Sequence, residues 1–349
     1  MSHHLPVARI VFITQHVDPE HPVLAATVPK IVALSALASE VTVLADSADG
    51  TVLPANCRVR LFAAPMKAVR GFRFEAALAR ELARRPRPGA ILAHMCPIYA
   101  VLAAPLARPL GIPVLLWYTH WHAGTTLRAA ERLSSAVLSV ERRSFPLSSR
   151  KVRAIGHGIE LSEFPCEEPA PDGPLRVLAL GRYSSAKGLD VVLRALADVD
   201  AGFTVHGPAL TAGEQAYRRE LERLAHELGL GERVRLEGPV PRRDVPALFA
   251  ASDLLVNNMR AGAADKVVYE AAASCLPVVA SNPVFDSLLP TELRFDRQDA
   301  AGLAERLRWF AALDGPARAA LGRKLHRQVS ERHSVEGWAA AVVEAAGLR

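Results

Sequence analysis

The chain alternates short segments that are apolar throughout with longer segments of helical periodicity, and it does so twice. Runs such as RIVFIT at 9–14 and AILAHMC at 90–96 lack the polar–apolar alternation of a strand with one face in water. They predict strands that are buried on both faces, as in a parallel sheet covered by helices on both sides. The pattern therefore predicts an α/β fold.

The alternation stops at IELSEFPCEEPAPDGPLR (159–176), which has four prolines, several acids and no periodicity, and then restarts. We interpret this stretch as a linker, because 349 residues are more than one core usually serves. The predicted domains are residues 1–165 and 166–333, followed by a C-terminal helix at 334–349 that crosses back to the first domain. Before the linker the predicted strands are 9–14, 41–46, 59–64, 90–96, 113–120, 136–140 and 152–158, with helices at 27–39, 72–85, 97–108 and 125–133. After it the strands are 176–182, 202–207, 233–238, 253–258 and 277–281, with helices at 186–198, 213–228, 241–250, 265–275, 299–312, 315–331 and 335–347.

Composition limits the cellular compartments in which the protein is expected and the kinds of partner that it is expected to bind. No apolar run approaches the roughly 20 residues that cross a bilayer, and the N-terminal residues do not resemble a signal peptide. The four cysteines, Cys57, Cys96, Cys166 and Cys275, have no paired spacing, which favours a reducing cytoplasm and argues against disulfides or a zinc site. A net charge of +6 makes anionic partners such as nucleotides or an acidic membrane face plausible.

The segment GRYSSAKG (181–188) follows a predicted strand and opens a predicted helix. Gly181 permits a tight turn, and Arg182 and Lys187 place two cations beside the free N–H groups of a helix start, which is a seat for a diphosphate. The alternative is a surface turn whose basic residues are solvated. The chain contains no GxGxxG, so a nicotinamide or flavin dinucleotide is disfavoured.

Glu270 is a single carboxylate within the apolar stretch KVVYEAAASCLPVVAS (266–281). A buried carboxylate needs hydrogen-bond donors, and two adjacent ribose hydroxyls would supply them. The alternative is a solvent-facing Glu270 paired with Lys266, although Lys before Glu is the less favourable order for an i,i+4 pair.

Taken together, these segments and GLGERVRLEGPVPRRDVPALFAASDLLV (229–256) resemble the donor domain of retaining family 4 glycosyltransferases. The resemblance implies a GT-B fold, in which two Rossmann-like domains face each other across a cleft. It also implies that Arg182 and Lys187 bind the donor diphosphate, that Glu270 holds the ribose, and that GPV, ending at Val240, lies beside the base. His120 matches a catalytic histidine of the first domain, with His122 as a second candidate.

The sequence departs from that family at two places. The first acid of its Glu-x7-Glu motif falls at Gly262, and Asp265 is expected to cap a helix instead. Backbone N–H groups around Gly262, Ala263, Ala264 and Asp265 remain candidates for donor binding. The Gly-Gly loop after the first strand is also missing, which leaves acceptor binding and the roles of His16 and His21 open.

The basic stretch MKAVRGFRFEAALARELARRPRPG (66–89) is the candidate for a partner surface. Basic amphipathic helices dock on anionic membranes, although a solvated helix face is the commoner explanation. Aromatic residues are not interleaved with the basic ones, so nucleic-acid binding is not expected.

These features predict a cytoplasmic enzyme, peripheral to the inner membrane face if the basic stretch docks there. It would move a sugar from a nucleoside-diphosphate sugar to a hydroxyl of a glycan, glycolipid or small molecule, with retention and with no metal or cofactor. A nucleotide-sugar epimerase and a catalytically inactive nucleotide-sugar-binding protein are the alternatives. The nucleotide, sugar, acceptor and oligomeric state are not determined by the sequence.

Overall fold

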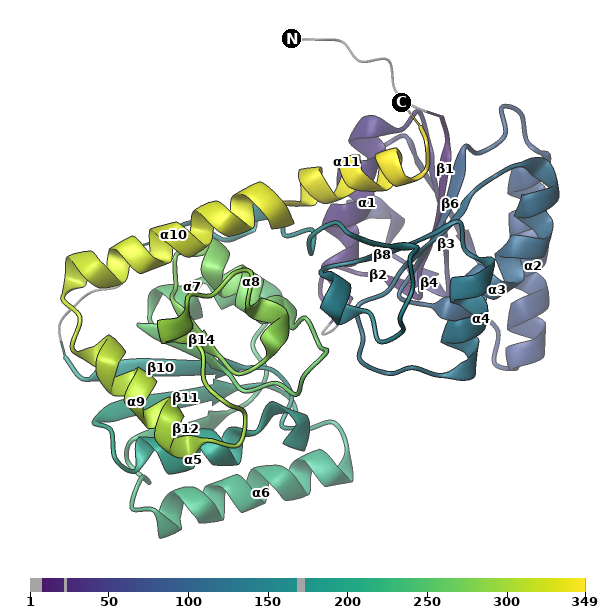
Figure 1. Cartoon of the computed structure of the whole chain (residues 1–349). Coiled ribbons are helices and arrows are strands. Elements are labelled where there is room, and N and C mark those ends of the chain that lie inside the picture. The colour runs from purple at the N-terminus through teal and green to yellow at the C-terminus, as the bar shows by residue number, and fades with distance from the viewer. Residues whose placement is uncertain (1–7, 22–23, 168–172, 349) are drawn as a thin grey trace. The chain divides into compact units, whose positions relative to one another are not determined.

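A computed structural model describes residues 8–21, 24–167 and 173–348, which form two compact α/β units (Figure 1). Unit 1 comprises Met1–Glu160 with Arg332–Arg349, and unit 2 comprises Leu161–Glu331. The chain thus passes from unit 1 to unit 2 after Glu160, rather than at 165, and returns after Glu331, rather than at 333.

The sheet of unit 1 is parallel, with the strand order β5-β3-β1-β6-β7-β8-β9. Its central strand β1 pairs with β3 on one side and β6 on the other, so Ile10 lies between Val41 and Ala90. All four side chains of β1 are buried, as a strand covered on both faces requires. The strands are β1 (Ile10–Ile13), β3 (Val41–Ala45), β5 (Cys57–Leu61), β6 (Ala90–His94), β7 (Val114–Trp117), β8 (Ala136–Ser139) and β9 (Val152–Ala154).

Unit 2 has a second parallel sheet, with the order β12-β11-β10-β13-β14. Its strands are β10 (Leu175–Leu180), β11 (Ala201–His206), β12 (Val234–Glu237), β13 (Leu254–Asn257) and β14 (Val278–Ala280). Both sheets have the doubly wound order in which the chain starts in the centre, moves to one edge and then returns to build the other. The predicted α/β class and Rossmann-like halves are confirmed.

Helices cover these sheets at the places predicted by periodicity. Those with unit 1 residues are α1 (Thr27–Leu37), α2 (Lys67–Ala83), α3 (Pro97–Ala107), α4 (Thr125–Leu133) and α11 (Val335–Ala345). Those of unit 2 are α5 (Leu189–Leu196), α6 (Ala212–Glu227), α7 (Val245–Ala250), α8 (Lys266–Ala273) and α9 (Ala300–Ala311), and α10 (Gly315–His333) continues into the return crossing. The C-terminal helix α11 belongs to unit 1 and packs against α1 (Figure 1).

Some predicted bounds differ from the structure: strand β7 ends at Trp117 instead of 120, and helix α7 begins at Val245 instead of 241. Helix α2 begins at Lys67, five residues before the expected start at 72, and takes in the first basic residues of the stretch. Strand β9 ends at Ala154 instead of 158, because the chain turns at Gly156 and Gly158, whose φ angles are +77° and +75°. A two-stranded parallel pair, β2 (His16–Val17) with β4 (Ser47–Ala48), was not predicted.

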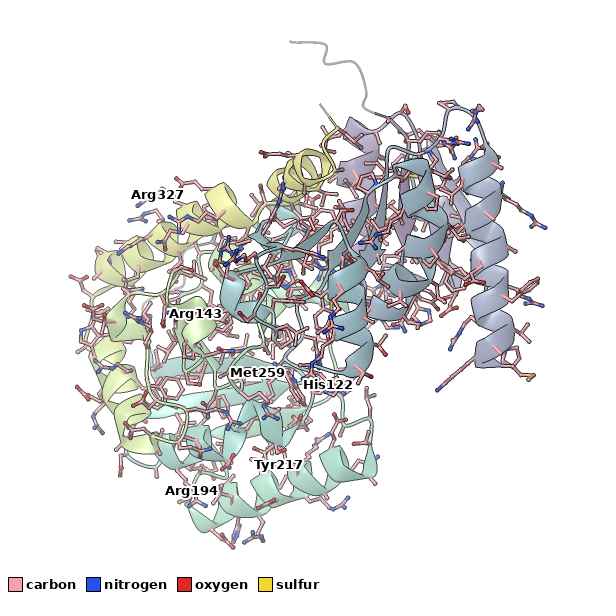
Figure 2. The ribbon with its side chains drawn as sticks, turned by 45° about the vertical axis from the view of Figure 1, so that its right-hand side comes forward. His122, Arg143, Arg194, Tyr217, Met259 and Arg327 are labelled. Carbon is pink, nitrogen blue, oxygen red and sulfur yellow. A yellow bond between two sulfur atoms is a disulfide. The ribbon has the colours of Figure 1, made fainter. Side chains whose placement is uncertain are left out.

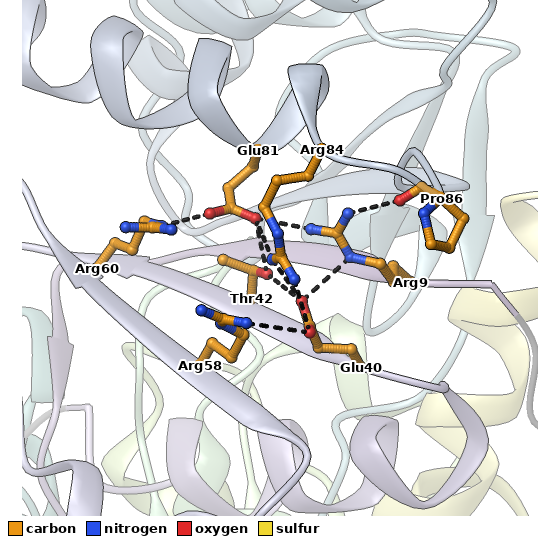
Figure 3. A network of polar contacts seen from close by, with 8 residues as sticks. All are labelled: Arg9, Glu40, Thr42, Arg58, Arg60, Glu81, Arg84 and Pro86. Atoms are coloured by element: carbon orange, nitrogen blue, oxygen red, sulfur yellow. Dashed lines mark hydrogen bonds and ion pairs between the residues drawn. The ribbon is translucent and has the colours of Figure 1, made fainter.

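An arginine–glutamate network holds the amino ends of the unit 1 strands (Figure 3). Glu81 of α2 is fully buried and pairs with Arg9 at 2.7 Å, with Arg84 at 2.7 Å and with Arg60. Glu40 accepts from Arg9 at 3.1 Å and from Arg84 at 2.8 Å. Hydrogen bonds from Arg84 are the main reason that the pKa of Glu40 falls from 4.5 to about 2.

The expectation that all four cysteines stay unpaired is wrong. Cys166 and Cys275 form a disulfide, with their Cα atoms 4.8 Å apart, whereas Cys57 and Cys96 are free. The two bonded residues are 109 positions apart in the chain, and only the folding of unit 2 brings them together. Within the described residues, no helix combines the length and the apolar character needed to cross a bilayer.

Candidate functional site

The unit 2 sheet changes direction between β10 and β13. Strand β10 pairs with β11 on one side and with β13 on the other, so the segments that follow β10 and β13 leave the sheet side by side. Ligands of doubly wound sheets bind at such a point, beyond the carboxyl ends of the strands. Gly181 and Lys187 come from the first segment and Asn257 and Asn258 from the second, and together they line a small cavity.

The first segment brings Lys187 back over the end of β10. Gly181 has a φ of +134°, and a Cβ there would lie 2.6 Å from Lys187 Nζ, so glycine is needed both for the turn and for the lysine. Lys187 ends the 3-10 turn η5 (Ser185–Lys187), and its Nζ donates to the carbonyl oxygen of Leu180 at 3.3 Å.

Lys187 forms an ion pair with Asp265, which also accepts from Asn257 Nδ2 at 2.8 Å. Burial raises the pKa of Asp265, but the charge and hydrogen bond of Lys187 outweigh it and the net shift is downward. Asp265 is therefore ionised. The prediction that its side chain caps α8 is wrong: it occupies the N-cap position but makes no capping hydrogen bond. The lysine, 78 residues away in the chain, takes the carboxylate instead.

Arg182, the second predicted diphosphate cation, is more open than Lys187. Its side chain is 54% exposed and pairs with Glu214 at 3.2 Å, whereas that of Lys187 is 16% exposed. Glu214 lies in the first turn of α6, where it also accepts from the backbone N–H of Leu210 at 2.7 Å. Arg182 is thus largely exposed to solvent on the segment after β10, with Glu214 as its ion-pair partner.

Glu270 is buried, at 3% exposure, on α8. Its Oε1 pairs with Lys266 Nζ at 3.1 Å and accepts from Arg242 Nη1 at 2.8 Å. Burial raises the pKa of Glu270, but the charges of Lys266 and Arg242 outweigh it, so that the net shift is downward and the carboxylate is ionised. The pair with Lys266 is present, although Glu270 does not face solvent.

Arg242 is the residue of this site that sequence reasoning missed. It begins the turn η6 (Arg242–Asp244), pairs with Glu163 at 2.6 Å as well as with Glu270, and lies 5.4 Å from the ring centre of Phe164. The only signal was its place in PRRD, directly after the GPV segment.

The remaining predicted donor residues surround α8 and β12. Gly262 has a φ of +86°, so it forms a turn that an acid would strain. Ala263 and Ala264 are buried, and the carbonyl oxygen of Ala263 accepts from Asn282 at 2.8 Å. Val240 is half-buried just after β12.

His120 and His122 lie in unit 1, on the exposed segment between β7 and α4, where Figure 2 labels His122. His120 stacks on Trp121, with ring centres 5.2 Å apart, and its Nδ1 accepts the backbone N–H of His122 at 3.1 Å. The proximity of His120 to a donor sugar stays a prediction.

A second polar group lies at the carboxyl ends of the unit 1 strands. His16 Nδ1 lies 2.7 Å from Ser47 Oγ, and its ring stacks on His21 at 4.9 Å. Asp46, directly after β3, pairs with Arg70 at 3.5 Å, and burial is the main reason that its pKa is raised. Its Oδ1 is buried without a hydrogen-bond partner within the described part of the chain, and sequence reasoning did not single it out.

Comparisons with known proteins match unit 2 by sequence. Residues 162–328 match the family described as "Glycosyl transferases group 1". A D-inositol 3-phosphate glycosyltransferase 1 of Catenulispora acidiphila is 34% identical over an alignment of 166 residues, and the match covers 42% of this chain and 38% of that protein. A GDP-mannose-dependent alpha-(1-6)-phosphatidylinositol monomannoside mannosyltransferase of Mycolicibacterium smegmatis is 28% identical over 51% of this chain and 55% of its own length. The chain thus spans about half or less of each of these relatives.

Solved structures extend the likeness in fold to almost the whole chain. A sucrose-phosphate synthase from Thermosynechococcus elongatus matches with a TM-score of 0.79 and 19% identity, over 97% of this chain and 98% of that one. HepE of Anabaena, solved in complex with UDP and glucose, matches with a TM-score of 0.76 and 18% identity, over 97% and 99%. By sequence, residues 162–328 thus belong to the group 1 glycosyl transferases, and the chain as a whole has the GT-B fold of two Rossmann-like units.

Proposed function

We propose that this protein transfers a sugar from a nucleoside-diphosphate sugar to a hydroxyl acceptor, with retention of configuration. The observation that carries the proposal is the convergence of Lys187, Asp265 and the Asn257–Asn258 pair at the switch point of the unit 2 sheet. The matched relatives support a nucleotide-linked donor, since one is named for GDP-mannose and HepE was solved with UDP and glucose.

Lys187 and Arg182 would hold the donor diphosphate. The ion pair with Asp265 orients the Lys187 ammonium before a donor arrives, and Arg182 at the rim is free to swing from Glu214 to a phosphate. Positive charge fixed at this place stabilises the negative charge that develops on the leaving diphosphate. The proposal needs no resident metal ion, because the two cations and the N–H groups at the start of α5 take that electrostatic role.

Glu270 would hold the ribose through Oε2, because both of its cation partners contact Oε1. A carboxylate kept ionised by Lys266 and Arg242 is a strong acceptor for two adjacent hydroxyls. The sugar would be held by backbone N–H groups around Gly262, Ala263 and Ala264, since no acid stands at Gly262.

The acceptor would bind at the carboxyl edge of the unit 1 sheet. Asp46 carries a buried, unpartnered Oδ1, and His16 and Ser47 lie at the same edge. A carboxylate oxygen and an imidazole suit the hydroxyl groups of a carbohydrate or polyol. We assign His120 to the donor sugar, as the family resemblance implies.

Unit 1, which would bind the acceptor, would contact an anionic membrane face. Leu61, Met66 and Phe72 are 59%, 67% and 72% exposed, at the edge strand β5 and along the first half of α2. Beside them lies a groove of about 370 Å³ whose lining includes Arg60, Arg73 and Arg80. Exposed apolar side chains next to arginines suit a bilayer with acidic headgroups. A lipid-linked acceptor agrees with the phosphatidylinositol compound in the name of one relative.

Calorimetric titration with UDP and GDP, followed by incubation with the matching nucleotide sugars, tests the proposal. We expect one nucleoside diphosphate to bind and its sugar to be released slowly as free sugar when no acceptor is present. Conversion of the nucleotide sugar into its epimer would indicate the epimerase, and binding without any turnover on adding acceptors would indicate a binding protein. If neither nucleotide binds, the site has been misassigned.

A further inference from the structure

Two cysteines and a histidine meet in unit 2. The ligand atoms of Cys166, Cys275 and His326 all lie within 4.8 Å of one another. Cys166 lies in the segment after the first crossing between the units. Cys275 lies two residues after the end of α8, and His326 lies in α10. We refer to these three residues as the Cys–His cluster.

The fold holds two members of the cluster in fixed positions. Cys275 is 2% exposed and has a φ of +61°, a conformation that a non-glycine residue adopts at some cost. Helix α10 passes closely over it, because Gly322 has no Cβ and a Cβ there would overlap the carbonyl oxygen of Cys275. His326, one turn further along α10, lies with Nδ1 2.6 Å from the carbonyl oxygen of Ala273.

The contact with Ala273 sets the tautomer of His326. A ring nitrogen 2.6 Å from a carbonyl oxygen must carry the hydrogen, so Nδ1 donates and Nε2 keeps its lone pair. Metal-binding histidines are commonly oriented in this way, by donating the other ring N–H to a backbone carbonyl. Among the described residues, Nε2 lies 3.3 Å from the hydroxyl of Ser330.

We propose that the reduced Cys–His cluster is a binding site for one zinc-like divalent ion, with Cys166 Sγ, Cys275 Sγ and a ring nitrogen of His326 as ligands. Thiolate and imidazole are the ligands that zinc prefers. Bond lengths of about 2.3 Å to sulfur and 2.0 Å to nitrogen place these tetrahedral ligand atoms roughly 3.5–3.8 Å apart. The three ligand atoms already lie within 4.8 Å of one another, and reduction frees the two sulfur atoms to move apart to this separation. A water molecule would complete the coordination.

The disulfide and the metal ion exclude each other. A dithiol reductant would give two electrons and two protons to the Cys166–Cys275 bond, leaving two thiols and the cyclic disulfide of the reductant. Zinc binding then releases the two thiol protons. Both the disulfide and the metal ion would link the segment after the first crossing to the end of α8. The metal ion would also bind His326 and so link α10, which leads into the return crossing.

The test is a titration of the full chain with Co²⁺, whose thiolate complexes absorb strongly in the near ultraviolet. The protein is reduced with a dithiol, freed of it under argon, and titrated in parallel with the oxidised protein. We expect one equivalent to bind the reduced protein with a thiolate charge-transfer band, Zn²⁺ to displace it, and the oxidised protein to show no band. A band of equal strength in both states, or none in the reduced one, overturns the proposal.

Three variants separate the ligands from general effects. Cys166→Ser changes an exposed residue and His326→Gln keeps a polar side chain on α10, so both should fold, which circular dichroism checks. Each should bind Co²⁺ at least about 100-fold more weakly. Cys57→Ser, which alters a free cysteine of unit 1, should bind like the parent. Unchanged affinity in Cys166→Ser or His326→Gln contradicts the assigned ligand set.

Discussion

Arg242 joins Glu163 and Glu270 through one guanidinium group, at 2.6 Å and 2.8 Å. Glu163 lies just after the first crossing between the units and Glu270 in the middle of α8, so a single side chain ties the entry of unit 2 to its candidate ribose residue. Removing one member of a buried ion pair leaves the other charges buried without a partner. Loss of any of these three side chains should therefore lower the free energy of unfolding.

Replacing Glu270 by Ala is expected to weaken nucleoside diphosphate binding at least about tenfold, because the ribose would lose a charged acceptor. The same change leaves Arg242 and Lys266 without their shared carboxylate, so the free energy of unfolding should fall by about 3 kcal/mol. Calorimetry and urea denaturation measure the two effects separately. Glu270→Gln, which keeps an oxygen acceptor, should lose less affinity. Parent-like nucleotide affinity in Glu270→Ala would contradict the ribose assignment.

Lys187→Ala and Arg182→Ala should each lower the turnover of sugar transfer by at least about tenfold, because each removes a charge that stabilises the leaving diphosphate. Initial rates with a saturating donor are the measurement. Arg223→Ala removes an arginine of α6 that is 63% exposed and, among the described residues, pairs with Glu227 one turn along the helix, so its rate should match the parent. Parent-like rates in both site variants would remove the diphosphate assignment.

The arginine network of unit 1 should be a large contributor to stability. Glu81→Gln removes the charge that faces Arg9, which is 4% exposed, and we expect a loss of about 3–5 kcal/mol in the free energy of unfolding. Glu75→Gln, on the same helix and only half-buried, is the matched control. Equal urea midpoints for the two variants would show that the network contributes little.

Mild acid should destabilise the protein through His333. Burial, and then the charge of Arg332, lower its pKa from 6.5 to about 4. Below pH 6.5 the unfolded chain therefore binds a proton that the folded chain does not, and stability is lost as the pH falls towards 4. Between pH 6.5 and about 5 the loss from this group is about 1–2 kcal/mol. His333→Asn should show a correspondingly smaller drop in unfolding free energy, and an identical drop would contradict this origin.

Binding to vesicles that contain acidic lipid should depend on the patch beside β5, which comprises the exposed Leu61, Met66 and Phe72 and the neighbouring arginines Arg60, Arg73 and Arg80. Arg73→Glu combined with Arg80→Glu is expected to weaken binding at least about thirtyfold, since each basic residue near such a surface contributes roughly 1 kcal/mol. Phe72→Ser should weaken it by removing exposed apolar area, whereas Arg223→Ala should not. Sedimentation with neutral and acidic vesicles measures this. If the double variant binds acidic vesicles like the parent, the patch does not face the membrane.

The sequence by itself determined the architecture, because a run of apolar residues without alternation predicts a strand that is buried on both faces. The run at 9–14 contains no alternation, so β1 had to be covered on both faces, and Ile10–Ile13 are all buried. The same local reasoning found Gly181 and Lys187, since a glycine after a strand and a cation at a helix start are neighbours in the chain.

Only the tertiary structure decided which charges meet. Lys187 and Asp265 are 78 residues apart, Arg242 and Glu270 are 28 apart, and Cys166 and Cys275 are 109 apart. Nothing in the local pattern favours one partner over another, because ion pairs and disulfides need proximity and orientation that arise from packing. Asp265 shows this most clearly: its place at a helix start predicted a cap, and the return of Lys187 over the end of β10 gave its carboxylate a stronger partner.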